Sequence, residues 1–182
     1  MLNKIKKIQL KKSKVKIVCL TAYSKNFAKI LDNHCDIILV GDSMANVLYG
    51  MKNTHKISLE TIIQHSVSVR KGIKKSLMVV DMPKGSYKNP IQAKKNAKLI
   101  IKKTNCDAVK IESNNKNFKI IKEIIKAKIP VMGHIGYTPQ FNEKFKVKGK
   151  DIKQSKKLMK EALSIEKAGA FSLVLECVKK SV

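Results

Sequence analysis

The chain of 182 residues has no tryptophan, a single arginine (Arg70), and only five Phe and four Tyr. Arginine suits bidentate recognition of phosphates and bases, and aromatic rings provide the platforms on which bases stack. Lys and Arg number 39 against 13 Asp and Glu, a formal net charge of +26. Because the lysines are spread over nearly all predicted helices and loops, we interpret them as solvated surface rather than a specific nucleic-acid site.

Other absences exclude further classes of protein. No apolar run reaches the roughly 18 residues that cross a membrane, and lysines interrupt residues 1–16 too often for a signal-peptide core. Neither a G-x-G-x-x-G sequence nor a P-loop is present, so nothing supports nucleotide-phosphate chemistry. The cysteines form no C-x-x-C pair, and apolar neighbours predict buried free thiols for three of the four, Cys19, Cys35, Cys106 and Cys177. A reducing cytoplasm is therefore the predicted location.

Short apolar runs alternate with longer amphipathic stretches along the chain. Runs of strand length span residues 16–21, 36–40, 77–80, 108–111, 130–133 and 172–175. Helical patterns span 26–33, 59–71, 90–102, 117–127 and 152–168. A strand followed repeatedly by a helix predicts an α/β fold with a parallel sheet, and the near-continuous apolar runs are typical of strands buried on both faces. No linker interrupts the pattern, so residues 1–182 are predicted to form a single domain.

Ionisable residues follow five consecutive predicted strands. A lone Asp at such a place is usually a helix cap or turn residue, a lone His is usually hydrogen-bonded in a core, and Lys110 is compatible with a solvent-facing position. Parallel strands, however, bring their carboxyl ends to one edge of the sheet, where active sites form. Together the residues predict an active site at that edge: Asp42, Asp81, Lys110 with Glu112, His134 and Glu176.

Three of these residues, Asp42, Asp81 and Glu112, are carboxylates. Oxygen ligands without cysteine favour Mg²⁺ or a similar hard cation over zinc. His134 is compatible with two roles, as a further metal ligand or as a hydrogen-bond donor to a substrate. The residues alone do not decide between these roles.

Four longer motifs carry a family resemblance. They are Val40-Gly41-Asp42-Ser43, Asp81-Met82-Pro83 with Gly85-Ser86-Tyr87, Gly133-His134-Ile135-Gly136 with Thr138-Pro139-Gln140, and Leu175-Glu176-Cys177-Val178. In order and spacing the chain resembles the ketopantoate hydroxymethyltransferase family, from about residue 5 onward. The resemblance implies a (β/α)₈ TIM barrel, of which about six βα units are present. Family members continue beyond the last motif, so we expect this sequence to be C-terminally truncated and its activity alone to be in question.

The resemblance also implies a reaction. A hydroxymethyl group passes from 5,10-methylenetetrahydrofolate to 3-methyl-2-oxobutanoate, giving 2-dehydropantoate for pantothenate biosynthesis. Homo-oligomers and Mg²⁺ dependence are implied as well, with no membrane or specific nucleic-acid partner. Carried over by motif, Asp42 and Asp81 hold Mg²⁺ with Glu112 in or near its shell, Ser43 and Lys110 bind the oxo acid beside Asp42 and Asp81, His134 lines the pocket, and Glu176 is the general base.

Two alternatives remain open at this stage. The first is a related Mg²⁺-dependent barrel that acts on another 2-oxo acid as an aldolase or lyase. The second is an inactive fragment whose positive charge binds nucleic acid without specificity.

Overall fold

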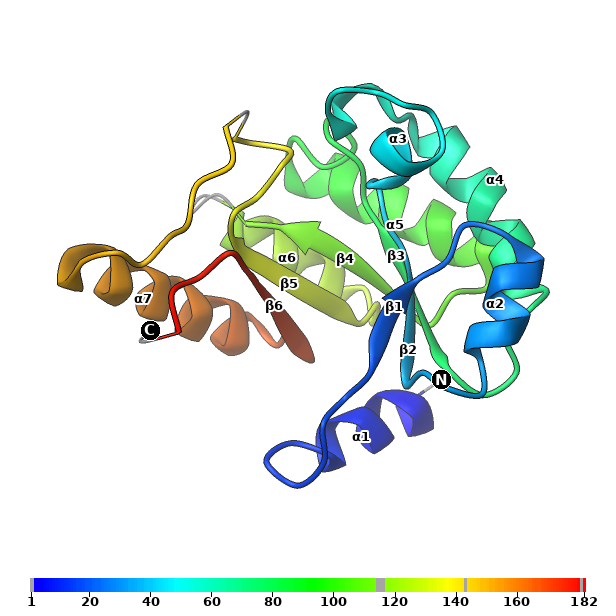
Figure 1. Ribbon diagram of the computed structural model, residues 1–182, viewed down its shortest axis with the longest axis horizontal. Coiled ribbons are helices and arrows are strands. Elements are labelled where there is room, and N and C mark those ends of the chain that lie inside the picture. The colour runs from blue at the N-terminus through cyan, green and yellow to red at the C-terminus, as the bar shows by residue number, and fades with distance from the viewer. Residues whose placement is uncertain (1, 114–116, 143, 181) are drawn as a thin grey trace.

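The computed structural model describes residues 2–113, 117–142, 144–180 and 182. Its centre is a curved sheet of six parallel strands in the order β1-β2-β3-β4-β5-β6, so strands that are consecutive in the sequence are also neighbours in space (Figure 1). All of the predicted strands are confirmed, with ends shifted by up to three residues: β1 Cys19–Thr21, β2 Ile37–Val40, β3 Leu77–Asp81, β4 Ala108–Glu112, β5 Val131–Gly136 and β6 Ser172–Glu176.

Helices follow the strands and cover the outer face of the sheet (Figure 1). Those that the sequence predicted are α2 Lys25–Leu31, α4 Leu59–Arg70, α5 Pro90–Thr104, α6 Phe118–Lys126 and α7 Ile152–Ala168. The sequence patterns did not indicate α1 Leu2–Leu10, α3 Met44–Val47 or the 3₁₀ helix Thr54–Lys56. The α3 and 3₁₀ segments are too short to show a helical period.

Capping residues fix where the longer helices begin and end. The side chain of Asn89 accepts a hydrogen bond from the backbone N–H of Gln92 at the start of α5, where Pro90 fits the first turn. Asp151 caps α7 in the same way by accepting from Gln154, and Gly169 ends α7 with a φ of 98°. These caps set the ends of two helices that lead the chain back to the sheet.

Alternate strand residues enter different cores. On β2, Ile38 and Val40 belong to the large core that includes buried residues of the outer helices, whereas Ile37 belongs to a second cluster. That second cluster also contains Ile5 and Ile8, which α1 packs against the inner face of the sheet. The inner face of the sheet is therefore apolar where α1 packs against it. Toward the carboxyl ends of the strands, every second residue of each strand continues to face this inner side.

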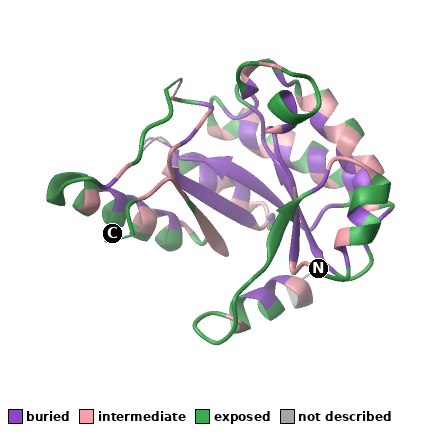
Figure 2. Cartoon of the chain, in the orientation of Figure 1, coloured by how far each residue is buried: buried purple, intermediate pink, exposed green. Residues whose placement is uncertain are grey.

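The prediction of strands buried on both faces is correct for the middle of the sheet and wrong for its margins. All residues of β3 and β4 are buried, but all of β1 is exposed and β6 is largely half-buried (Figure 2). The cysteine prediction is correct for free thiols and wrong for burial at all positions but Cys106, since Cys35 and Cys177 are half-buried. Cys19 on β1 is exposed and Cys106 is buried, and all four thiols are free. Among the described residues, no helix is long and apolar enough to cross a membrane.

Candidate active site

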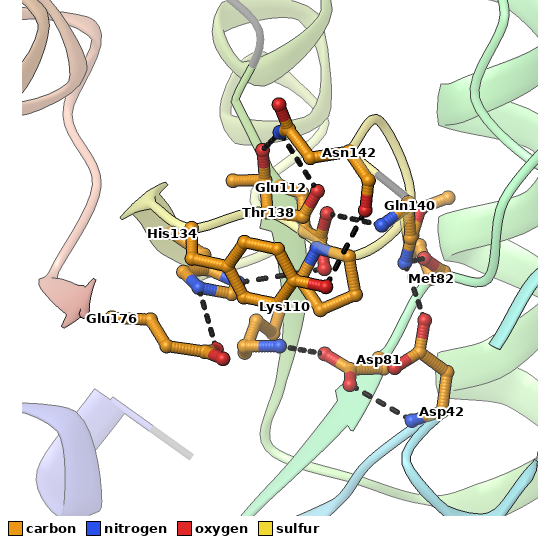
Figure 3. Close-up of polar contacts among 12 residues, drawn as sticks. Asp42, Asp81, Met82, Lys110, Glu112, His134, Thr138, Gln140, Asn142 and Glu176 are labelled. Carbon is orange, nitrogen blue, oxygen red and sulfur yellow. Dashed lines mark hydrogen bonds and ion pairs between the residues drawn. The ribbon is translucent and has the colours of Figure 1, made fainter. Parts of the chain in front are cut away.

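The sheet register brings the predicted strand-end residues together. Asp81 is paired with Lys110 across β3 and β4, and Glu112 is paired with His134 across β4 and β5. On β3, Asp81 is two and four residues beyond Val79 and Leu77, which belong to the inner cluster. Because side chains alternate along a strand, the ionisable residues continue the inner face at the carboxyl edge. Figure 3 shows them converging there with Asp42 and Glu176.

Asp42, Asp81 and Lys110 form a buried ionic cluster. The Lys110 Nζ lies 2.6 Å from Asp81 Oδ1, and the backbone N–H of Asp42 donates to Asp81 Oδ2 over 3.0 Å. Burial and the neighbouring Asp81 charge raise the pKa of Asp42 to about 6. Burial alone lowers the pKa of Lys110, but attraction to Asp81 and Asp42 outweighs it, so the pKa is raised. Lys110 is thus a fixed cation, and its predicted solvent-facing alternative is wrong.

Glu112, His134 and Glu176 form a second row beside this cluster. The ring Nδ1 of His134 lies 3.6 Å from Glu112 Oε1, and Nε2 lies 3.1 Å from Glu176 Oε2. Within the described residues neither ring nitrogen makes a well-directed hydrogen bond. Burial raises the pKa of Glu112 to about 8 and lowers the pKa of His134 despite the neighbouring Glu176. The imidazole is therefore a neutral group, and Glu176, with 39% of its side chain exposed, is the more accessible carboxylate.

Ser43 lies beside the aspartates. Its hydroxyl is 2.8 Å from the Tyr23 hydroxyl. A Cβ on Gly41 would meet the Ser43 hydroxyl at 2.8 Å and Asp81 Oδ2 at 3.4 Å. Because Gly41 has no side chain, the Ser43 hydroxyl and the Asp81 carboxylate can both lie close to its backbone.

Sequence reasoning assigned no role to Gln140, which is the most connected polar residue of the site. Its side-chain Nε2 donates to Asp42 Oδ2, and its backbone N–H donates to Glu112 Oε2 (Figure 3). The Tyr87 hydroxyl donates to its Oε1. Both residues lie within the motifs that carried the family resemblance, but an uncharged amide gives no signal of chemistry by residue type.

The predicted three-carboxylate metal set is only partly assembled. Across residues 2–113, 117–142, 144–180 and 182, no three His, Cys, Asp or Glu side chains are grouped closely enough to share an ion. Glu112 accepts from Gln140 and faces His134 instead. The Asp42–Asp81 pair still fits Mg²⁺, which commonly uses one or two protein carboxylates and fills its shell with water and substrate. The pKa of Asp42 is raised chiefly by burial and secondly by the neighbouring Asp81 charge.

A cavity of about 370 Å³ opens between the end of β5 and α7, and neither Asp42 nor Asp81 lines it. Gly136 and Thr138 line it next to the site, and Lys157 and Leu158 of α7 form part of its wall. Glu112, His134 and Glu176 are not among the residues that line this cavity.

The chain is similar in sequence to known hydroxymethyltransferases. The chain is 55% identical over 172 residues to the 3-methyl-2-oxobutanoate hydroxymethyltransferase of Pelagibacter ubique (strain HTCC1062), covering 94% of this chain and 67% of that protein. The chain thus spans about two thirds of the length of this relative.

Two solved structures share the fold at low sequence identity. Phosphonopyruvate hydrolase in complex with oxalate and Mg²⁺ matches with a TM-score of 0.73 and 11% identity, covering 98% of this chain and 64% of that one. A 2,3-dimethylmalate lyase of the PEP mutase/isocitrate lyase superfamily matches with a TM-score of 0.69 and 15% identity, covering 95% of this chain and 63% of that one. The family model described as ketopantoate hydroxymethyltransferase matches residues 3–182, and the chain therefore belongs to this family.

Proposed function

We propose that the chain serves the transfer of a hydroxymethyl group from 5,10-methylenetetrahydrofolate to 3-methyl-2-oxobutanoate, giving 2-dehydropantoate in pantothenate biosynthesis. The observation that carries this proposal is the buried Asp42–Asp81–Lys110 cluster, with Glu176 on a neighbouring part of the same edge. A 2-oxo acid offers a carboxylate for a fixed cation and an acidic C–H for a carboxylate base. The name of the Pelagibacter relative supports this substrate.

Each residue has a part that its position supports. Lys110 supplies positive charge that orients the oxo-acid carboxylate, and Ser43 donates a hydrogen bond to the same molecule. Glu176 accepts the proton from C3, because it is the accessible carboxylate at the edge. The resulting carbon nucleophile forms a bond to the methylene carbon carried by the folate. Both C–N bonds of that carbon break in the overall reaction, water provides the hydroxyl oxygen of the product, and tetrahydrofolate leaves. Neutral His134 lines the pocket between Glu112 and Glu176.

Asp42 and Asp81 are the residues that would hold Mg²⁺. A bound Mg²⁺ would supply Lewis acidity toward the keto and carboxylate oxygens of the substrate. Glu112 stays a prediction as a ligand or near neighbour of the ion. Its contacts with Gln140 and His134 favour a supporting position beside the ligands of the ion.

We further propose that the six strands belong to a (β/α)₈ barrel and form one domain with the helices around them. Their sequential order and common direction support this topology, as does the match to the lyase superfamily. A homo-oligomer that acts on small molecules, as the family resemblance implies, completes the proposal, with the cytoplasm as the location that the free cysteines favour.

Exchange of the C3 proton of 3-methyl-2-oxobutanoate in D₂O tests the first half of the chemistry without any folate. Proton NMR of the 182-residue chain with Mg²⁺ is expected to show loss of the C3 signal, and Glu176→Gln is expected to abolish it. Glu166→Gln, an exposed carboxylate on α7, is the matched control and should exchange like the wild type. Wild-type exchange that persists in Glu176→Gln would overturn the role of Glu176.

Turnover with the folate donor separates the proposed reaction from the aldolase or lyase alternative. Formation of 2-dehydropantoate that requires 5,10-methylenetetrahydrofolate is the expected result. Cleavage or condensation of another 2-oxo acid without folate would favour the alternative.

A further inference from the structure

Gln140 lies in the connection between β5 and α7 and is 1% exposed. Its side-chain nitrogen donates to Asp42 Oδ2 over 2.8 Å and to the Met82 carbonyl over 3.0 Å. Its backbone N–H donates to Glu112 Oε2 over 2.9 Å. The residue thus joins carboxylates that come from two different parts of the sheet.

The orientation of the amide is fixed by its neighbours. The Tyr87 hydroxyl donates to Gln140 Oε1, while the two N–H groups face the Asp42 carboxylate and the Met82 carbonyl. The reversed amide would put its carbonyl oxygen against two acceptors. Because both acceptors are buried, that arrangement would leave them unpaired at a large cost. Only one orientation of Gln140 satisfies every polar atom in this group.

We propose that Gln140 is a positioning residue that holds Asp42 in the orientation that receives a divalent cation, with Tyr87 fixing the amide. The inference rests on the proposed function, which makes Asp42 a metal ligand. One oxygen of the Asp42 side chain is held by Gln140 and the side chain is buried, so it has little rotational freedom. Partners that orient ligating carboxylates in this way contribute to metal affinity.

Mn²⁺ binding to the whole chain, followed by electron paramagnetic resonance, measures this role without turnover. Gln140→Met keeps the length of the side chain and removes both donors. We expect it to weaken Mn²⁺ binding by about 10- to 100-fold, the usual range for such partners. Tyr87→Phe removes only the hydroxyl that orients the amide, and a smaller weakening in the same direction is expected.

Asn142→Leu is the matched control. Asn142 is an amide of the same connection, but its Nδ2 donates to the Thr138 carbonyl and hydroxyl rather than to a carboxylate. This variant is expected to lower the melting temperature while keeping the wild-type Mn²⁺ affinity. A purely structural Gln140 would behave like Asn142.

The outcomes distinguish failure of the Gln140 role from failure of the proposed metal site. Wild-type Mn²⁺ affinity in folded Gln140→Met would overturn the positioning role and leave the metal site intact. If Gln140→Met does not fold, Tyr87→Phe decides, and an unchanged affinity there would overturn the role. A wild-type chain that binds no Mn²⁺ would overturn both the proposed metal site and the role of Gln140.

Discussion

The Nζ of Lys110 lies 2.6 Å from Asp81 Oδ1, and the two residues are register partners on adjacent central strands, β3 and β4. The side chains of Lys110 and Asp81 are only 7% and 4% exposed. Two acidic groups, Asp81 and Asp42, therefore share one buried cation, Lys110. The pair thus links the stability of the sheet to the charge of the candidate active site.

Removal of the Lys110 charge should destabilise the fold as well as the site. Lys110→Met leaves Asp81 without its buried partner, and loss of one member of such a pair costs about 3–5 kcal/mol of unfolding free energy. Urea unfolding measures this change. Lys160→Met, at an exposed position on α7, is the control and should change the unfolding free energy by less than about 0.5 kcal/mol. Equal stability of the two variants would contradict the ionic cluster.

Asp32 anchors the start of β3 far from the active-site edge. Its carboxylate accepts from the backbone N–H groups of Lys74, Lys75 and Ser76 over 2.8–3.1 Å. Asp32→Asn removes the charge of this acceptor, and hydrogen bonds to charged groups are stronger than neutral ones, so we expect a loss of about 2–3 kcal/mol at pH 7. Chemical unfolding measures the loss, and a change below the error of the fit would contradict the anchoring role.

The same contacts predict a pH dependence. Burial by itself raises the pKa of Asp32, but the hydrogen bonds from Ser76, Lys74 and Lys75 outweigh it and lower the pKa below 3.8. Because the folded-state pKa is below the unfolded one, this stabilisation is complete above the unfolded pKa and is lost as the pH falls through the folded pKa. The stability difference between wild type and Asp32→Asn should therefore persist at pH 5–7 and shrink below about pH 3.8. A difference that does not change with pH would argue against this assignment.

The sequence predicted the alternation of strands and helices well because buried parallel strands are short apolar runs. It also predicted the active-site edge, since the charged residues after Val40 and Val80 interrupt those runs abruptly. The sequence left two alternatives open where tertiary packing decides. The alternation of apolar and polar residues around Lys110 is the same whether its side chain faces water or a buried Asp81. Only the packing of β3 beside β4 in the folded chain shows that it faces Asp81.

Gln140 and Glu112 illustrate the other limit of sequence reasoning. A carboxylate count grouped Glu112 with Asp42 and Asp81, which stays a prediction, but it did not indicate the hydrogen bond that Glu112 accepts from the Gln140 backbone N–H. A backbone donor has no signature in the sequence. The contact between Gln140 and Asp42 joins residues 98 positions apart, which no local pattern encodes.

Gly136 separates a steric effect from a purely conformational one. Its φ is +95°, and an added Cβ would lie 2.1 Å from the Glu176 carbonyl oxygen, so Gly136→Ala must push β6 away. Gly50 has a φ of +60° with nothing within 4 Å, so Gly50→Ala introduces backbone strain alone, about 1 kcal/mol. We expect Gly136→Ala to cost at least about 2 kcal/mol more than Gly50→Ala. Similar thermal unfolding of the two variants would contradict the close approach of β5 and β6.

Mg²⁺ should stabilise the folded chain if the aspartate pair is its site. A ligand that binds only the folded state at 100 times its dissociation constant adds about 2.7 kcal/mol, so saturating Mg²⁺ should raise the melting temperature and EDTA should reverse the rise. Asp42→Asn removes one negative charge from the pair and is expected to lose most of the rise in melting temperature.

Asp151→Asn, the control, changes an exposed helix cap on α7. It should lower the starting melting temperature but keep the full Mg²⁺ shift, because a cap contributes to folding without contacting the ion. An equal Mg²⁺ shift in Asp42→Asn and wild type would place the cation elsewhere.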